Sequence, residues 1–260
     1  MSNLDNLLKW TREACARYEL EPIAVYRRRG EHDWPITANN ETELTEALDQ
    51  GGHFLPLPKE PAALANIIEV SLVDFLMAEA NKNAGISMKK GTERGYPDID
   101  LSGQKFGDKY FAIDIKAARR KASNKTGKVN QRKTQSRITL YTGNTYFKFP
   151  QLHWPGTFRP FDDYDAHIDI IAIYTLDESS KSRIKDFELI VQESWRIGSK
   201  QRSSTTREYI GAVDDIERLR KGEGEFETKE AFYKFWRKYP FKFGPTAAKQ
   251  LEKLLAAKDE

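Results

Sequence analysis

Cysteine and histidine are scarce in this sequence. One cysteine and four histidines occur among 260 residues. A single cysteine forms no internal disulfide bond, and so few nitrogen and sulfur ligands disfavour a structural zinc site. Long apolar runs are also lacking, because no stretch of about 18 apolar residues is present and no transmembrane helix is predicted. Disulfide-rich secreted proteins and membrane-spanning proteins are therefore not the classes expected here.

Targeting and nucleotide-binding signals are lacking as well. The first residues do not show the basic and then apolar pattern of a secretory signal peptide. No glycine-rich phosphate-binding loop is present either. We therefore expect an intracellular, cytoplasmic protein without a membrane partner.

The composition is that of a globular protein. The chain is 39% hydrophobic, which is enough to bury a substantial core. Charged residues make up 31% of it but are of both signs, so wholesale disorder is not expected. We expect one large domain over residues 1–260.

The basic residues are concentrated in one segment. Nine lysines and arginines, Arg119 among them, and no acidic residue lie between Lys116 and Arg137, although the net charge of the whole chain is only +3. Polyanion binding is the simplest interpretation, because neutralised phosphates release their counterions. A solvated, mobile basic loop would have the same composition. The position of the segment beside a group of acidic residues favours DNA.

Two predicted strands carry the most informative residues. Residues 111–116 alternate, so a strand there would place Asp114 and Lys116 on one face and apolar side chains on the other. The preceding Tyr-Pro-Asp segment supplies Asp98, which Pro97 holds outside a helix. If the two strands pair, Asp98, Asp114 and Lys116 converge.

This convergence suits metal-assisted hydrolysis of a phosphodiester. Two neighbouring carboxylates resist full ionisation unless a cation lies between them. Mg²⁺ accepts a few hard oxygen ligands, and it can lower the pKa of a bound water and stabilise charge on a phosphoryl oxygen. A nearby lysine can orient that water. A surface ion pair on an edge strand would present the same residues, so the short pattern alone leaves both interpretations open.

The rest of the sequence predicts helices and strands in alternation. Helices are expected from Leu4 to before Pro22, over 41–48, from Pro61 to about 84, after Thr228 as a cap, and from Pro245 onward. Strands are expected over 23–26 and 34–37 as a hairpin, over 168–174 as a strand covered on both faces, and over 187–191. Residues 51–58 and 198–211 are expected to be loops, and His167 is expected to be a structural histidine rather than a ligand.

The order of these motifs resembles the EcoRV family of type II restriction endonucleases, within the PD-(D/E)xK nuclease superfamily. The separations of 29 positions between Glu69 and Asp98 and of 16 between Asp98 and Asp114 agree with that family. The similar segments are Ile68-Glu69, Tyr96-Pro97-Asp98, 112–116, Ile138-Thr139-Leu140, Pro160-Phe161-Asp162, Ala166-His167, Tyr174-Thr175, Ser204-Thr205-Thr206, Gly211, 221–224 and 232–239.

The resemblance implies a fold and an assembly. The expected fold is α/β, with a restriction-endonuclease-like core in which a central mixed β-sheet is flanked by helices. The protein would be a homodimer with a DNA-binding cleft. Its subregions would be a dimerisation segment (about 20–40), a catalytic core (about 61–150) and a DNA-recognition and C-terminal part (about 160–260).

The resemblance also implies roles for particular residues. Asp98 and Asp114 would bind Mg²⁺, Glu69 would be an auxiliary acid near the metal, and Lys116 would position or activate the attacking water. DNA contacts are expected from Lys200, Gln201, Arg202, Ser203, Ser204, Thr205, Thr206 and Arg207 in the major groove, from Thr92, Glu93 and Arg94 near the minor groove, and from Arg119.

The implied reaction is the Mg²⁺-dependent cleavage of both strands of a palindromic double-stranded DNA site. The ends would be blunt, with 5′-phosphate and 3′-hydroxyl groups. Mn²⁺ would substitute for Mg²⁺, whereas Ca²⁺ would support binding without cleavage. A cognate DNA methyltransferase is expected in the same bacterial host.

Two other functions fit parts of the pattern. The first is a structure-directed repair or junction nuclease, and the second is a non-catalytic DNA-binding protein of the same fold.

The chain also departs from the family pattern. Residues 49–62 look like an insertion, and Ala117 and Ala118 replace hydroxyl residues. The segment expected in the major groove, residues 200–207, also differs from the family, so the protein is expected to recognise a different DNA sequence.

Overall fold

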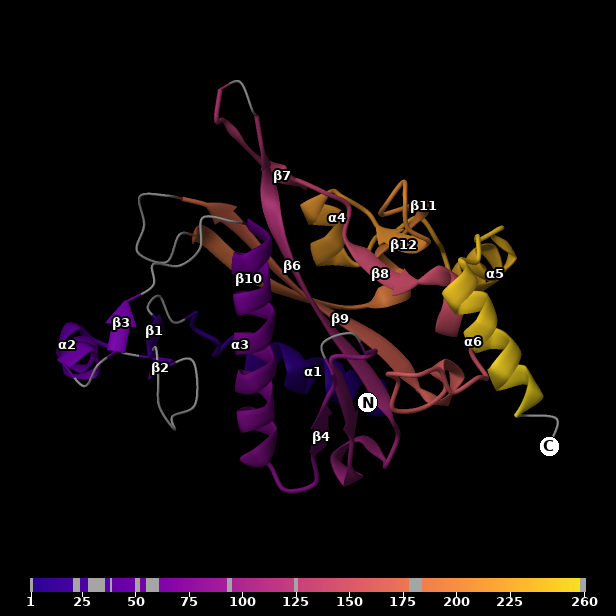
Figure 1. Cartoon of the computed structure of the whole chain (residues 1–260), viewed down its shortest axis with the longest axis horizontal. Helices are drawn as coiled ribbons and strands as arrows, with labels where there is room; N and C mark the ends of the chain where they lie inside the picture. Colours follow the sequence, from indigo (N-terminus) through magenta and orange to yellow (C-terminus); the bar gives the residue numbers. More distant parts are fainter. Residues whose placement is uncertain are drawn as a thin grey trace.

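A mixed β-sheet forms the centre of the protein (Figure 1). The computed structural model describes residues 2–20, 24–27, 36–37, 39–49, 52–54, 61–92, 95–123, 126–177 and 184–257. The sheet contains β4 (Ser87–Lys90), β5 (Ile99–Ser102), β6 (Phe111–Ala122), β9 (Ala166–Leu176) and β10 (Ile184–Glu193), and β7 (Val129–Thr134) pairs with the far part of β6. Strands β6 and β9 are parallel and the other pairs are antiparallel, which confirms the predicted mixed sheet.

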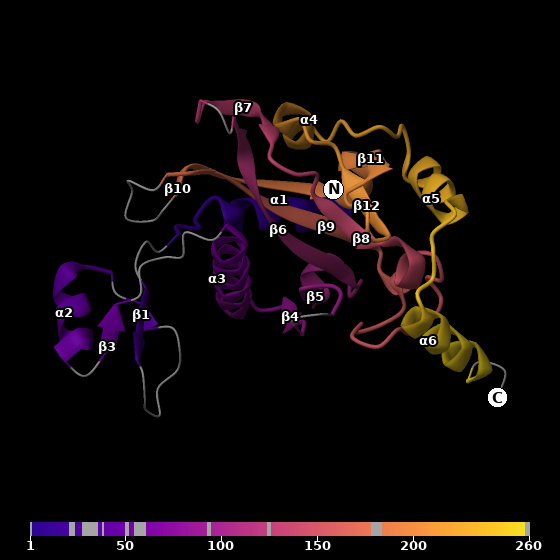
Figure 2. The same ribbon diagram turned by 45° about the horizontal axis from the view of Figure 1, so that its top comes forward.

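Both faces of this sheet are covered. The apolar run in β9 predicted such a strand, and ten consecutive residues from Ala166 to Thr175 are buried. Helices α1 (Asn3–Cys15) and α3 (Pro61–Asn81) pack on one face, where Leu7 and Leu76 share a core with Ile113. Elements from the C-terminal half of the chain cover the other face, as Figure 2 shows from a second side. Helix α1 ends earlier than the predicted boundary before Pro22.

The C-terminal half of the chain contains a second, three-stranded sheet. Its strands are β8 (Thr139–Thr142), β11 (Gly198–Arg202) and β12 (Tyr209–Ala212), in the order β11-β12-β8. The prediction of a loop over 198–211 was therefore wrong for most of that range. Helices α4 (Ile216–Lys221), α5 (Lys229–Lys238) and α6 (Pro245–Ala256) follow, and the predicted Thr228 cap of α5 is confirmed, because its side chain accepts a hydrogen bond from Ala231 N at 3.1 Å.

A third, small sheet is formed near the N-terminus. Strands β1 (Ala24–Arg27) and β2 (Ile36–Thr37) pair antiparallel, as predicted for the hairpin, although the turn between them lies outside the described residues. Helix α2 (Glu41–Asp49) agrees with prediction. The predicted loop at 51–58 was wrong in part, because β3 (Gly52–Phe54) pairs with β1. The rest of the predicted insertion, including residues 55–60, is outside the described part of the chain.

The basic segment forms a β-hairpin rather than a mobile loop, as far as it is described. Strands β6 and β7 pair beyond Arg120, and Figure 1 shows the hairpin projecting from the sheet. Arg132 and Lys133 form ion pairs with Asp215 and Asp214, each at 3.3 Å, beside the start of α4. Lys121 and Lys128 are exposed. The positive charge therefore lies on a β-hairpin that ion pairs hold against the start of α4.

His167 is a buried member of an aromatic cluster. Its ring stacks on Phe161, with centroids 3.8 Å apart, and its Nδ1 lies 2.6 Å from the Tyr96 hydroxyl. Burial lowers the pKa of His167 well below its usual value, and the positive charges of Lys229 and Arg237 act in the same direction. The prediction of a structural histidine agrees with this environment. None of the described helices has the length and hydropathy needed to span a bilayer.

His167 should make stability depend on pH. Its folded-state pKa lies below the unfolded value of about 6.5, so the unfolded chain binds more protons below that pH and stability falls as the pH drops. We expect His167→Gln to remove the contribution of this residue to the pH dependence of the free energy of unfolding, which amounts to up to about 1.4 kcal/mol per pH unit. Urea unfolding at several pH values between about 7.5 and 5 measures the slope for both proteins.

The exposed His153 offers the matched control. His153→Gln should leave the slope as it is in the original protein. Equal slopes for His167→Gln and His153→Gln would contradict the assignment of His167.

Candidate active site

Asp98 immediately precedes β5 and reaches across to β6. The backbone N–H of Ile115 donates a hydrogen bond to Asp98 Oδ2 at 2.6 Å. Pairing of β5 with β6, with Ile99 opposite Ile113, produces this approach. The pairing of the two strands was the condition on which the predicted convergence depended, and the structure confirms it.

Asp114 and Lys116 occupy the predicted face of β6. Lys116 Nζ lies 2.6 Å from Asp114 Oδ2, and the two side chains are 24% and 8% exposed. Their strand lies between β5 and β9 in the sheet. The alternative of a surface ion pair on an edge strand is therefore wrong.

The acidic side chains and the lysine perturb one another strongly. Burial raises the pKa of Asp114 well above its usual value; Lys116 opposes this shift, and Asp98 and Asp169 add to it. Burial by itself lowers the pKa of Lys116, but the three carboxylates outweigh it and raise that pKa. Lys116 therefore stays a charged ammonium group at neutral pH, which suits electrostatic stabilisation rather than proton abstraction.

Glu69 reaches the same region from α3. Its Oε1 accepts a hydrogen bond from the backbone N–H of Ala117 at 3.0 Å. Burial raises the pKa of Glu69, whereas the Ala117 amide and Lys116 lower it and Asp98 raises it further. The structure thus brings Glu69 beside the other three residues, although one of its oxygens is engaged by β6.

Two open hollows flank these residues. One, of about 350 Å³, lies between α3 and residues 90–92 and is lined by Glu69 and Asp98. The other, of about 450 Å³, is lined by Lys116, Arg119, Arg137 and Thr139, among others. Glu69 and Asp98 are thus open to a substrate from one hollow and Lys116 from the other, while Asp114 lies buried between them.

Asp169 is a neighbour that sequence reasoning missed. It lies on β9 as the register partner of Asp114 and is 0% exposed. Burial raises its pKa to about 7, whereas Lys116 and the Ser194 hydroxyl lower it and Asp98 raises it further. The sequence signal was one acid inside an apolar run, but only the register with β6 shows where that acid lies.

The donor set fits Mg²⁺. Asp98 and Asp114 offer hard carboxylate oxygens on adjacent strands, and within the described ranges no three His, Cys, Asp or Glu residues are placed to hold a metal ion by themselves. Mg²⁺ is commonly bound by one or two carboxylates, with waters and substrate phosphates completing its shell. The site therefore has the ligands that such an ion needs and no excess of them.

The predicted base-reading segment is organised by Arg137, which was not predicted. The Arg137 guanidinium donates hydrogen bonds to Ser199 Oγ (3.1 Å), Ala212 O (2.9 Å) and Gln201 Oε1 (2.8 Å). It therefore fixes the side chain of Gln201 at the edge of the β11–β12 hairpin. Lys200, Gln201, Thr205, Thr206 and Arg207 are exposed, as contacts with DNA require.

Like Gln201, three further predicted contact residues, Arg202, Ser203 and Ser204, are engaged within the protein. Arg202 pairs with Glu208 at 2.7 Å, and the Ser203 hydroxyl lies 2.7 Å from that of Thr139. Ser204 Oγ accepts hydrogen bonds from the backbone N–H groups of Thr206 and Arg207. These residues shape the turn. Of the predicted minor-groove residues, Thr92 is exposed beside the Asp98 hollow, whereas residues 93–94 lie outside the described part.

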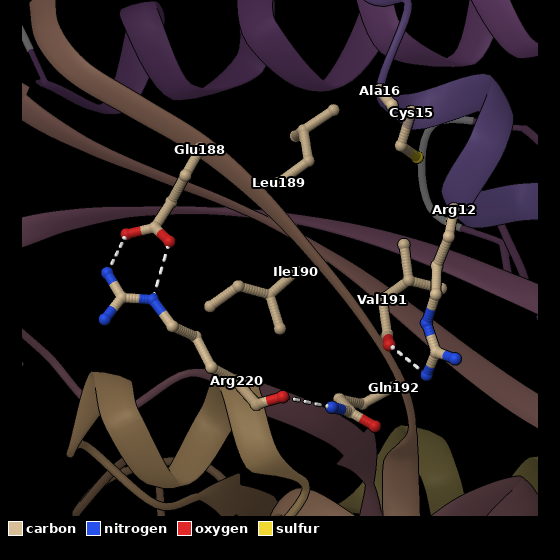
Figure 3. A pocket seen from close by; sticks show the side chains of 9 residues that line it. All are labelled: Arg12, Cys15, Ala16, Glu188, Leu189, Ile190, Val191, Gln192 and Arg220. Atoms are coloured by element: carbon tan, nitrogen blue, oxygen red, sulfur yellow. Dashed lines mark hydrogen bonds and ion pairs between the residues drawn. The ribbon is translucent and has the colours of Figure 1, made fainter.

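Another hollow, of about 410 Å³, lies away from this site (Figure 3). It is formed by α1, β10 and α4, and its charged groups are satisfied within the protein. Glu188 pairs with Arg220, and Arg12 donates a hydrogen bond to Val191 O at 3.2 Å. Since it contains none of the predicted site residues, it is not the candidate active site.

Comparison with known proteins identifies the family of this chain. A family model described as restriction endonuclease EcoRV matches residues 31–256, so the chain belongs to this family of restriction endonucleases, which are DNA-binding nucleases. The type II restriction enzyme EcoRV of Escherichia coli is 24% identical over 217 aligned positions, in a match that covers 77% of this chain and 84% of the relative.

Removal of the Lys116 ammonium should destabilise the metal-free protein. We expect Lys116→Met to lower the free energy of unfolding by about 2 kcal/mol, because the surrounding acids lose their cation. The cost stays below the roughly 3–5 kcal/mol of a fully buried pair, since a quarter of the lysine side chain is exposed. Millimolar Ca²⁺ should restore more stability to the variant than to the original protein, as measured by urea unfolding.

Lys133→Met is the control, because it breaks an exposed pair with Asp214. Its effect should stay below about 1 kcal/mol. Equal losses for the two variants, or equal stabilisation of both by Ca²⁺, would contradict a charge-balanced site around Lys116.

Proposed function

We propose that this protein is a Mg²⁺-dependent type II restriction endonuclease. It cleaves both strands of a palindromic site in double-stranded DNA and leaves blunt ends with 5′-phosphate and 3′-hydroxyl groups. The observation that carries the proposal is the meeting of Asp98, Asp114 and Lys116 across β5 and β6. Membership of the restriction endonuclease family supports it.

Each active-site residue has a different chemical role in the proposed reaction. Asp98 and Asp114 hold Mg²⁺, which when bound lowers the pKa of a coordinated water and stabilises charge on the phosphoryl group. Mn²⁺ substitutes for it, and Ca²⁺ supports binding only. Lys116, kept positive by the surrounding carboxylates, orients the attacking water and faces the negative charge that develops on the phosphate. Glu69 is an auxiliary acid and fixes β6 at Ala117.

The proposed DNA contacts are of two kinds, contacts with base edges and contacts with phosphates. Exposed side chains of the β11–β12 hairpin, Gln201 and Arg207 among them, read base edges in the major groove. Exposed lysines of the β6–β7 hairpin contact phosphates, which fixes the register of the protein on the duplex. Two copies of the chain, joined through the N-terminal region at about 20–40, match a palindromic site by two-fold symmetry. A methyltransferase of the same specificity protects the DNA of the host.

Loss of either carboxylate should abolish cleavage. We expect Asp98→Ala and Asp114→Asn to lower the cleavage rate by at least about a thousandfold, because the metal loses a ligand while the base-reading hairpin is untouched. Digestion of a sequenced plasmid with Mg²⁺, followed by sequencing of the ends, measures cleavage and gives the site. Binding of a duplex that contains the site, with Ca²⁺ present, should survive.

Asp108→Asn, an exposed acid outside the site, is the matched control and should cut normally. Persistent cleavage by both active-site variants would refute the proposal. Cleavage of a branched substrate, without discrete products from long duplex DNA, would support the junction nuclease instead.

Gln201 and Lys121 should affect binding in different ways. Gln201→Ala should reduce the preference for the cognate site by about 1–3 kcal/mol, because Arg137 fixes this side chain for base contact. Lys121→Ala should weaken cognate and random DNA alike and reduce the salt dependence by about one counterion. Titrations of a cognate duplex and of a random-sequence duplex at several salt concentrations measure the affinities and their salt dependence. An equal loss of affinity for the two duplexes in Gln201→Ala would contradict a role of this residue in base recognition.

A further inference from the structure

Asp169 is the acidic residue near the active site that the proposed mechanism leaves without a role. It lies in the middle of β9, is 0% exposed, and neither of its carboxylate oxygens has a hydrogen-bond partner. A buried carboxylate without donors is costly. Ile168 and Ile170 flank it, so the strand itself accommodates apolar side chains.

A buried carboxylate without hydrogen-bond donors contrasts with Asp100 in the same sheet. Asp100, on β5, is also buried, but Arg159 donates hydrogen bonds to its two oxygens at 3.0 and 2.9 Å. Near Asp169, the Ser194 hydroxyl donates a hydrogen bond to the carbonyl oxygen of His167 at 3.3 Å, and its proximity to Asp169 lowers the pKa of that carboxyl group. Asp169 thus lacks a cationic partner that binds both of its oxygens, as Arg159 binds those of Asp100.

The cation that acts on Asp169 is Lys116. Asp114 and Asp169 are register partners in the parallel pair β6–β9, and Lys116 follows two residues after Asp114 on the same face. Neighbouring strands lie about 4.8 Å apart, so one flexible lysine side chain can serve either carboxylate. Here its ammonium group lies 2.6 Å from Asp114 Oδ2.

We propose that Asp169 is a positioning residue that takes over the Lys116 ammonium group when a divalent cation binds Asp98 and Asp114. The inference rests on the proposed metal-dependent function. Three carboxylates and one ammonium group carry a net charge of about −2 when ionised, which one divalent cation balances. Movement of the ammonium group to Asp169 frees both oxygens of Asp114 for the metal and satisfies the buried carboxylate.

Asp169 therefore controls how strongly Lys116 competes with the metal. Without the Asp169 carboxylate, the ammonium group stays on Asp114 and the metal must displace it without a second anion to receive it. The cost appears as weaker metal binding, even when no DNA is present. Outer partners of this kind typically change metal affinity by about 10–100-fold.

Calorimetric titration of the full-length protein with Ca²⁺, without DNA, tests this role. We expect Asp169→Asn to weaken Ca²⁺ binding by about tenfold, and Asp169→Ala to do the same. The metal-free variants should also unfold at a higher temperature than the original protein, because they lack the unpartnered buried charge. Thr175→Val is the matched control, since Thr175 is a buried residue of β9 whose hydroxyl also has no hydrogen-bond partner. This control should leave the Ca²⁺ affinity unchanged.

A double-mutant comparison tests whether Asp169 acts through Lys116. In a Lys116→Met background no ammonium group competes for Asp114, so adding Asp169→Asn should change Ca²⁺ affinity by less than about threefold. The same tenfold loss in both backgrounds would show that Asp169 acts on the ion directly and would overturn the inference.

The two proposals fail in different ways. If the original protein binds no Ca²⁺, the proposed metal-dependent function fails. If it binds Ca²⁺ and the Asp169 variants bind it equally well, only the role of Asp169 fails. A change in thermal stability without a change in affinity would also refute the role of Asp169 alone, because a purely structural residue would behave in that way.

Discussion

The mutual repulsion of carboxylates on the central sheet is the constraint around which this protein is built. Asp98, Asp114 and Asp169 come from three neighbouring strands, and Lys116 is the cation that faces all three. The opposite face of β6 carries Phe111, Ile113 and Ile115, which pack beneath α1 and α3. The same alternation that builds the core therefore concentrates negative charge on the side of the substrate.

This arrangement sacrifices stability in the metal-free state. Burial raises the pKa values of Asp114 and Asp169, so keeping both ionised near neutral pH is unfavourable until a cation arrives. Apolar side chains at these positions would make a more stable sheet. The retention of acids in the core is what a site that recruits a divalent ion requires, and it is the usual conflict between stability and activity.

Sequence patterns predicted the parts of this fold that depend on local periodicity. The alternation in β6, the apolar run in β9 and the Thr228 cap each have a local cause, and each is confirmed. Two parts required knowledge of distant pairing. The β11–β12 hairpin has too few apolar residues to predict strands, and Asp169 acquires meaning only from the parallel register with β6. Arg137 was counted as one charge in a basic segment, yet its contacts are all with residues at least 62 positions away.

Under the proposed function, Arg137 links the hairpin that reads bases with the residues that act on the phosphate. It lines the same hollow as Lys116 while its guanidinium holds Gln201 and Ser199 of the recognition hairpin. Strand β8 follows Arg137 directly and pairs with β12, so the hairpin is joined to the hollow by backbone as well as by side chains. Under the proposed function, a duplex that contacts Gln201 and places its phosphate at Lys116 would touch two places that Arg137 links, because Arg137 binds Gln201 and lines the same cavity as Lys116. Because closely packed side chains transmit strain, a mismatch at the hairpin would, under the proposed function, change the geometry at Lys116.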